Sequence, residues 1–223
     1  AAAAKQYGQE PGQCTACHAG RYDPQRVAQG KGQRTLGHKG RAHHKVLRHG
    51  AALGLGDEPL IVSCWGSLGA REMNKKIAQF MRCECEDGTP FHHIHATGSF
   101  GWRWMPDYVK EQGVDLAAHP ALDMREYIYD MPQVLAAADL IICRAGAATI
   151  AEVCASGTPC IMVPSPNVTG NHQEKNARVL ERSGAAAVVR EADCDGKSLY
   201  ETAKSILSDA GRMRAMRASA RDM

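Results

Sequence analysis

From Pro59 onward, short apolar segments alternate with helical segments of about ten residues, and this alternation constrains the fold more than any other feature of the chain. The predicted strands are residues 60–64, 91–97, 114–118, 139–143, 160–164 and 185–190. The predicted helices are residues 70–82, 102–112, 132–138, 147–156, 172–183, 197–208 and 211–220. Buried strands that alternate with helices indicate a parallel sheet covered on both faces. The sequence therefore predicts an α/β domain with a doubly wound parallel sheet.

The first fifty residues differ in composition from the rest of the 223-residue chain. Residues 1–50 contain nine Lys or Arg and two acids, a net charge of +7, whereas the remaining 18 basic and 22 acidic residues give residues 51–223 a net charge of −4. A basic segment with so few aliphatic residues cannot offset the entropy of ordering. We expect residues 1–56 to be a disordered basic tail or a mistranslated stretch of a gene fragment, and residues 57–223 to form the globular domain.

Cysteine usage and the beginning of the chain favour a cytoplasmic protein. Residues 1–20 show no signal-peptide pattern, and nine Cys is an odd number, which argues against a disulfide framework. No apolar run approaches the 18 residues of a membrane span. The basic tail lacks the aromatic interleaving that supports base stacking, so we expect no nucleic-acid partner.

Two glycine-containing loops that open predicted helices are candidate anion sites. Residues 65–69 and 144–149 each follow a predicted strand, where ligands of doubly wound sheets bind. Free N–H groups at a helix start favour an anion, and the Ser67 hydroxyl could add a hydrogen bond. A tight turn without a ligand explains residues 65–69 equally simply. A dinucleotide site is disfavoured, because the second predicted strand ends in Ala96-Thr97-Gly98-Ser99 without an acid.

Two further groups of polar residues could bind the hydroxyl groups of a sugar. Glu152 lies one helical turn after Thr149, where a carboxylate can accept hydrogen bonds from both hydroxyls of a ribose. The alternative is an acid that merely favours the positive end of the helix. Asn171-His172-Gln173 opens another predicted helix with groups that both donate and accept hydrogen bonds, although Asn171 is also an ordinary helix cap. Together these features predict a nucleotide-sugar site.

A serine hydrolase is the less favoured catalytic alternative. Ser67 stands in Trp65-Gly66-Ser67-Leu68-Gly69, which departs from the Gly-x-Ser-x-Gly elbow at its first position. Asp139 and His172 follow Ser67 in the chain order that hydrolases use.

Four motifs occur in the same order as in a known family. They are Gly66-Ser67-Leu68-Gly69-Ala70-Arg71 with Asn74, Tyr127-Ile128-Tyr129-Asp130-Met131, Cys143-Arg144-Ala145-Gly146-Ala147-Ala148-Thr149 with Glu152, and Asn171-His172-Gln173-Glu174-Lys175-Asn176-Ala177. Residues 57–223 thereby resemble the C-terminal, donor-binding domain of glycosyltransferase family 28, in its peptidoglycan branch. The resemblance implies the Rossmann-like half of a two-domain GT-B architecture.

The resemblance also implies an activity and a set of contacts. The family's enzymes transfer N-acetylglucosamine from UDP-GlcNAc to a lipid-linked muramoyl-pentapeptide, converting lipid I to lipid II with inversion. The implied substrate-binding residues are Ser67, Gly69, Ile128, Ala147, Ala148, Thr149, Glu152, His172 and Gln173, where His172 stands at a variable polar position. Ser67 would contact the diphosphate, the Ile128 backbone would hold the uracil, and residues 147–149 would serve the phosphates and the sugar. Glu152 would bind the ribose, and Gln173 the GlcNAc hydroxyls. No cofactor and no metal are implied.

Departures from the family limit what we expect of this chain alone. The glycine-rich loop of the family's first domain, which supplies the proposed general base, does not occur here, and Trp65 replaces a glycine common in the first donor loop. The catalytic residue therefore stays unassigned. We expect UDP-GlcNAc binding without transfer, as an inactive fragment or as a module that needs a separate acceptor-binding domain. The lipid-linked acceptor, peripheral membrane association and a location at the cytoplasmic face of the plasma membrane would all depend on that domain.

Several metal-like patterns are better explained without a metal. Cys14-Thr15-Ala16-Cys17-His18 matches a haem-attachment pattern, and zinc is the stronger of its two metal interpretations. The possible zinc ligands are Cys14 and Cys17 with two of His38, His43, His44 and His49. Asp193-Cys194-Asp195 is expected to be a polar loop, and His93 and His95 are expected to pack within a strand. Cys83, Cys85, Cys143, Cys154 and Cys160 are expected to pack as small apolar residues.

Overall fold

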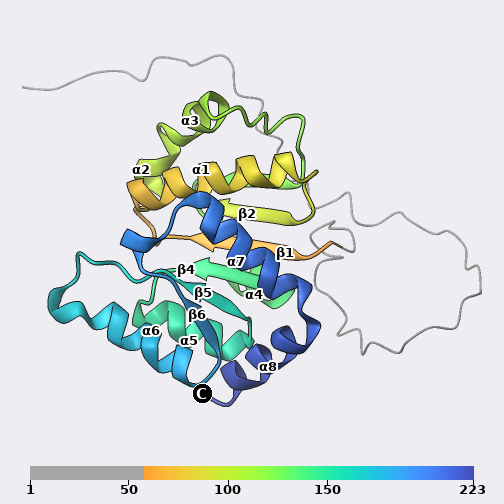
Figure 1. Cartoon of the computed structure of the whole chain (residues 1–223). Helices are drawn as coiled ribbons and strands as arrows, with labels where there is room; N and C mark the ends of the chain where they lie inside the picture. Colours follow the sequence, from red (N-terminus) through yellow and green to blue (C-terminus); the bar gives the residue numbers. More distant parts are fainter. Residues whose placement is uncertain (1–57) are drawn as a thin grey trace, which may run out of the picture. The chain divides into compact units, whose positions relative to one another are not determined.

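The computed structural model describes residues 58–223. Six strands form one sheet, and helices cover both of its faces (Figure 1). The strands are β1 (Leu60–Cys64), β2 (His92–Ala96), β3 (Leu122–Arg125), β4 (Leu140–Cys143), β5 (Cys160–Met162) and β6 (Ala186–Val188). The helices are α1 (Arg71–Glu86), α2 (Ser99–Trp102), α3 (Met105–Glu111), α4 (Met131–Ala137), α5 (Ala147–Ser156), α6 (His172–Arg182), α7 (Gly196–Ser208) and α8 (Ala210–Arg221). Two short 3-10 turns, η3 (Thr169–Asn171) and η4 (Glu191–Asp193), precede α6 and α7.

The strand order confirms the predicted doubly wound sheet. All five pairings are parallel, and the order is β3-β2-β1-β4-β5-β6. This is the strand order of dinucleotide-binding folds, in which the chain reverses direction across the sheet between β1 and β4. A ligand crevice is therefore expected beyond the carboxyl ends of these two strands.

Alternation along the strands divides the apolar core into two layers. On β1, Ile61 contributes to the core on one face, with α1, α3 and α7, and Leu60 and Val62 contribute to the core on the other face, with α4, α5 and α6. Because a parallel sheet buries both faces, its strands are apolar almost throughout, as β1 and β4 are here.

One predicted strand is wrong, and one predicted helix begins later than expected. Residues 114–118 do not form a strand: Val114 is buried, but the Ala118 N–H donates to the Asp115 carbonyl at 3.1 Å and the Ala117 N–H donates to the Asp115 carboxylate at 3.0 Å, which closes a turn. The third strand is instead β3, a few residues later. The predicted helix over residues 102–112 is confirmed as α3, which begins three residues later than predicted because Pro106 occupies its first turn and favours a helix start there. The short helix α2 precedes it.

A fully buried network of hydrogen-bonded side chains joins α1, β1 and β2. The Ser63 hydroxyl lies 2.7 Å from His93 Nε2 and 2.7 Å from His95 Nδ1, and His93 Nδ1 lies 2.8 Å from the Glu84 carboxylate. Burial, together with the neighbouring His93, lowers the pKa of His95 to about 3, so His95 is neutral. The expectation that His93 and His95 pack within a strand is confirmed, and Ser63 is the group that links them.

Replacing Ser63 by alanine should destabilise the domain strongly. In the Ser63→Ala variant, His93 Nε2 and His95 Nδ1 both lose the buried hydroxyl that they contact. This loss should lower the free energy of unfolding by roughly 2–4 kcal/mol. Urea denaturation measures this loss. The control is Ser205→Ala on the exposed side of α7, which should change stability by less than about 0.5 kcal/mol. Equal effects of the two substitutions would contradict the role given to the network.

The prediction that five cysteines pack as small apolar residues is confirmed. Cys143 and Cys160 are buried, whereas Cys83, Cys85 and Cys154 are half-buried and pack against the two core layers. Burial raises the pKa of the Cys160 thiol to about 12, so this group is a small apolar residue at neutral pH.

Candidate functional site

The loops predicted to hold a ligand all leave the carboxyl edge of the sheet. Ser67 follows β1, Ile128 follows β3, residues 147–149 follow β4, and His172 and Gln173 follow β5. Since β1 pairs with β4 and β4 pairs with β5, three of these segments leave adjacent strands. The fold therefore brings the predicted residues to one edge, where the strand order predicts a ligand site between β1 and β4.

Three helices begin at this edge without a side-chain cap. The caps of α1, α5 and α6 are Ala70, Gly146 and Asn171, and none of their side chains accepts a hydrogen bond from the first turn. By contrast, Asp195 and Asp209 cap α7 and α8 with their carboxylates. The first N–H groups of α5 are thus left for water or a ligand, and the exposed Ala147 and Ala148 do not cover them.

Glu152 lies in the second turn of α5. Its side chain is exposed, yet its charge acts on the thiols at the carboxyl ends of β1 and β4. Burial and then Glu152 raise the pKa of the Cys64 thiol to about 12, and both also raise the pKa of Cys143. The charge of Glu152 therefore acts at the carboxyl ends of β1 and β4.

The first loop is shaped by a close contact between two backbones. A Cβ atom on Gly69 would stand 2.0 Å from the Thr97 carbonyl oxygen, and one on Gly98 would stand 2.1 Å from the Gly69 nitrogen. The Ser67 carbonyl accepts a hydrogen bond from the Ser99 N–H at 3.0 Å. The glycine at position 69 is thus required by the neighbouring β2 loop, and this contact leaves the exposed Ser67 hydroxyl free of the packing.

Two glycines of this loop should respond differently to substitution. Both Gly66 and Gly69 have a positive φ, but a Cβ on Gly66 meets nothing within 4 Å. Gly66→Ala should cost about 1–2 kcal/mol from backbone strain alone. Gly69→Ala should cost more than about 3 kcal/mol because the loop must also separate from the β2 loop. Urea denaturation of the pair measures the difference, and equal losses would show that the contact is not tight.

The start of α6 is organised by its own polar residues. The Gln173 side-chain oxygen accepts a hydrogen bond from the Ser165 N–H at 2.9 Å, which leaves the amide NH2 to donate. Asn171 has a left-handed backbone and its side-chain amide donates to Glu174, so it is not the ordinary cap that the sequence allowed. His172 is exposed, with Nδ1 at 2.9 Å from the Thr169 carbonyl oxygen.

The side chain of Ile128 is buried, so only its backbone is placed to contact a ligand. Tyr127 and Tyr129 on either side are exposed, and their rings meet edge to face with centroids 5.1 Å apart. This burial pattern suits the backbone contact that the sequence predicted for Ile128.

The serine hydrolase alternative is wrong. Asp139 accepts a hydrogen bond from the Leu60 N–H at 3.0 Å, at the first residue of β1, and pairs with Arg217 at 3.0 Å. Ser67 and His172 lie beyond the opposite ends of the strands. A triad cannot form when its acid stands at the amino edge of the sheet and its nucleophile at the carboxyl edge.

Comparison with known proteins identifies the family of this domain. The family model described as "Glycosyltransferase family 28 C-terminal domain" matches residues 60–222. The chain belongs to glycosyltransferase family 28. This membership confirms the resemblance found in the four motifs, and the parallel sheet is the one expected of this family 28 domain.

The relatives of this family 28 domain are longer proteins. It is 40% identical over 166 residues to the UDP-N-acetylglucosamine--N-acetylmuramyl-(pentapeptide) pyrophosphoryl-undecaprenol N-acetylglucosamine transferase of Caldanaerobacter subterraneus subsp. tengcongensis, a match that covers 74% of this chain and 44% of the relative. The enzyme of the same name from Acetivibrio thermocellus is 38% identical over 167 residues, covering 75% and 44%. The chain thus spans less than half the length of these relatives.

Solved structures of glycosyltransferases share the fold. The crystal structure of Acinetobacter baumannii MurG superposes with a TM-score of 0.62 at 27% identity, covering 78% of this chain and 48% of that one. The glycosyltransferase VinC in complex with dTDP gives a TM-score of 0.55 at 16% identity, covering 75% and 36%, and it supports the fold alone.

A group of residues beside the predicted site was not found from the sequence. The Trp65 side chain is 5% exposed and lies under the Arg144 guanidinium at 5.6 Å from the ring centroid. Arg144 pairs with Glu191 at 2.6 Å and donates to the Val163 carbonyl at 3.0 Å. Lys76 donates to the Glu191 carbonyl. Ion pairs between residues far apart in sequence leave no local pattern, so only the fold reveals that α1, β4 and η4 meet here.

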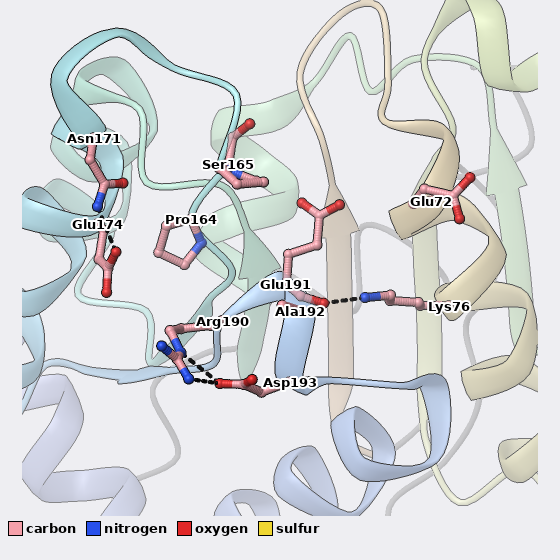
Figure 2. Close-up of a pocket in the computed structure, with 11 residues that line it drawn as sticks. Glu72, Lys76, Pro164, Ser165, Asn171, Glu174, Arg190, Glu191, Ala192 and Asp193 are labelled. Atoms are coloured by element: carbon pink, nitrogen blue, oxygen red, sulfur yellow. Dashed lines mark hydrogen bonds and ion pairs between the residues drawn. The ribbon is translucent and has the colours of Figure 1, made fainter.

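The same group adjoins a pocket of about 590 Å³ in this family 28 domain. Figure 2 shows Asn171, Glu174 and Pro164 on one side of it and Glu72 and Lys76 on the other. The remaining lining residues are Ser165, Pro166, Arg190, Glu191, Ala192 and Asp193. None of the nine residues predicted to bind substrate lines this pocket.

Metal ligation finds no support among residues 58–223, where no group of three or more His, Cys, Asp or Glu could hold an ion. Asp193 pairs with Arg190, Asp195 caps α7 and Cys194 is buried, so this segment is the polar loop expected from the sequence. The zinc and haem alternatives at residues 14–49 lie outside the described residues.

Proposed function

We propose that this family 28 domain binds UDP-N-acetylglucosamine in the crevice between β1 and β4, as the donor half of an inverting N-acetylglucosaminyltransferase. The observation that carries the proposal is the uncapped start of α5 with Glu152 one turn further on. An uncapped helix start attracts a diphosphate, and a carboxylate at this distance can accept hydrogen bonds from both ribose hydroxyls. The names of the relatives support N-acetylglucosamine as the sugar.

The proposed contacts follow the order of the ligand. The Ser67 hydroxyl and the N–H groups of residues 147–149 bind the diphosphate, and the Ile128 backbone binds the uracil. Gln173 donates its amide to the sugar hydroxyls, with His172 beside it. Negative charge grows on the departing UDP during transfer, so donors fixed at the start of α5 stabilise the transition state more than the bound donor.

The acceptor half of the reaction lies outside the described residues. Inverting transfer requires a base that removes a proton from the acceptor hydroxyl, and none of the proposed site residues is assigned to that task. We propose a lipid-linked muramoyl-pentapeptide as the acceptor, by analogy with the relatives' names, and a reaction at the cytoplasmic face of the membrane. No helix among residues 58–223 is long and apolar enough to cross a bilayer. Because no base is assigned among the proposed site residues, we propose that a separate acceptor-binding domain supplies the base and the acceptor contacts.

Isothermal titration calorimetry tests donor binding. The purified chain should bind UDP-GlcNAc and UDP in a one-to-one ratio and should bind ADP more weakly. Absence of UDP-GlcNAc binding would refute the proposal.

Transfer assays separate a donor domain from a binding module. The chain alone should not transfer GlcNAc to a lipid I analogue, and an acceptor-binding domain from a relative added in trans should restore transfer. Binding without restored transfer would favour an inactive nucleotide-sugar module.

A further inference from the structure

One arginine connects four segments at the carboxyl edge of the sheet. Arg144 directly follows β4, and its guanidinium pairs with the Glu191 carboxylate at 2.6 Å and donates to the Val163 carbonyl at 3.0 Å. The same guanidinium lies over the ring of Trp65, which directly follows β1, at 5.6 Å from the ring centroid. Arg144 thus joins the segments that follow β1, β4, β5 and β6, which are consecutive strands in the sheet.

These segments carry the proposed contacts to the donor. The loops that begin with Trp65 and Arg144 each lead, within three residues, into the proposed diphosphate contacts. The segment after β5 carries Ser165, whose N–H donates to the Gln173 side-chain oxygen at 2.9 Å. A displacement of Arg144 would therefore be transmitted to several donor contacts at once.

The ion pair of Arg144 is anchored on its other side as well. Lys76 of α1 donates to the Glu191 backbone carbonyl, and Figure 2 shows this contact beside the Glu191 carboxylate. The side chains of Arg144 and Glu191 are only 14% and 18% exposed, so each charge depends on the other for neutralisation. Since Glu191 already neutralises its charge, Arg144 acts on a ligand through the loops that it joins.

The Trp65 ring is the surface on which Arg144 lies. Trp65 is 5% exposed and belongs to the same core layer as Val163. Its indole N–H is buried and has no hydrogen-bond partner among residues 58–223. The ring is therefore held by packing and by contact with the guanidinium, because an aromatic face attracts a cation. The glycine that is common at this position in family 28 would offer no such face.

We propose that Trp65 is a positioning residue that holds Arg144, and through it the loops after β1, β4 and β5, in the arrangement that receives a diphosphate. The Trp65 ring is buried and acts without touching the ligand. The inference rests on the proposed function and deepens it, because it names a residue of this chain that orders the donor loops before binding. Loops that are already ordered lose less conformational entropy when the ligand binds.

Two substitutions of Trp65 separate its aromatic face from its bulk. Trp65→Phe keeps an aromatic face and loses no hydrogen bond, whereas Trp65→Leu keeps apolar packing without a face for the guanidinium. The matched control is Phe91→Leu. It removes a ring that is 7% exposed from the same core layer, directly before β2 and thus at the opposite, amino edge of the sheet.

Calorimetry with UDP and urea denaturation compare these variants. Trp65→Leu should bind UDP about tenfold more weakly than Phe91→Leu, and Trp65→Phe should stay within about threefold of the unsubstituted chain. Urea denaturation should show that Trp65→Leu and Phe91→Leu both lose stability, so stability alone does not account for the difference in affinity. Equal UDP affinities of these two leucine variants would overturn the proposal.

Glu191→Gln distinguishes positioning from a direct contact between Arg144 and phosphate. Loss of the ion pair loosens Arg144, so the affinity for UDP should fall by about threefold or more. An Arg144 that bound the phosphates itself would be released by the same substitution, and the affinity would rise. A rise would overturn the proposal.

Hydrogen exchange without nucleotide tests the order of the loops separately from donor binding. The Ile150 N–H donates to the Gly146 carbonyl at 3.0 Å, at the start of α5. This amide should exchange at least about fivefold faster in Trp65→Leu than in Phe91→Leu. Equal exchange in the two variants would refute this inference, whereas an unsubstituted chain that fails to bind UDP would refute the proposed function.

Discussion

Replacing Ala147 by aspartate should lower the affinity for UDP-GlcNAc by roughly two orders of magnitude without destabilising the domain. Ala147 is the first residue of α5 and is exposed, so the new carboxylate would stand at the helix start proposed to hold the diphosphate. Repulsion between like charges a few ångströms apart is worth several kcal/mol where water is partly excluded. The same carboxylate should stabilise the uncapped helix by about 0.3–1 kcal/mol. Calorimetry and urea denaturation measure the two effects.

Ala147→Asp should lower the affinity for UDP-GlcNAc and raise the free energy of unfolding, so the two measurements together distinguish a binding effect from misfolding. A variant that loses affinity by misfolding would also lose stability, whereas Ala147→Asp should lose affinity alone. The control is Ala210→Asp at the first residue of α8, which is likewise an exposed alanine at a helix start. The start of α8 lies away from the proposed site. It follows the end of α7, and Tyr200 of α7 donates a hydrogen bond to Asp87 at the C-terminal end of α1, whereas the site lies at the N-terminal end of α1. Unchanged UDP-GlcNAc affinity in Ala147→Asp would show that the phosphates bind elsewhere.

Replacing Glu152 by alanine should weaken UDP binding by roughly ten- to a hundredfold. Hydrogen bonds to a charged acceptor are worth about 1.5–3 kcal/mol, and the ribose would lose its acceptor. The effect should depend on the ribose, so the wild-type chain should prefer UDP to 2′-deoxy-UDP by about tenfold or more, and Glu152→Ala should bind the two about equally. Calorimetry with both ligands completes the thermodynamic cycle.

An exposed glutamate on another helix provides the control. Glu201→Ala on α7 removes the same charge and should keep the preference for UDP. If Glu152→Ala weakened UDP and 2′-deoxy-UDP by the same factor, Glu152 would act through helix electrostatics rather than through the ribose.

The fold was predictable where burial on both faces of a strand forces an apolar segment. The strands β1 and β4 are fully apolar or nearly so, and their positions follow directly from the sequence. The edge strand β3 carries Asp123 and Arg125, an ion pair half open to solvent, so its sequence resembles a polar loop. The nearby Val114 is more apolar but lies before a turn that Asp115 closes. Local hydrophobicity therefore favoured the wrong segment.

The candidate site was predictable to the extent that it is built from helix starts and local loops. Positions such as Ser67 and Glu152 follow from their place after a strand or one turn into a helix. The meeting of Trp65, Arg144 and Glu191 depends on tertiary packing and has no sequence signature. The close approach of Gly69 to the backbone of Thr97 and Gly98 was also not foreseen, because a local sequence does not show which loops lie against one another.

A crystal structure of the chain with UDP-GlcNAc would test the location of the donor site most directly. We predict that the diphosphate lies within hydrogen-bonding distance of the N–H groups of residues 147–149 and that Glu152 accepts hydrogen bonds from the ribose. A ligand seated instead in the pocket between Lys76 and Arg190, with the start of α5 unoccupied, would contradict the proposed site.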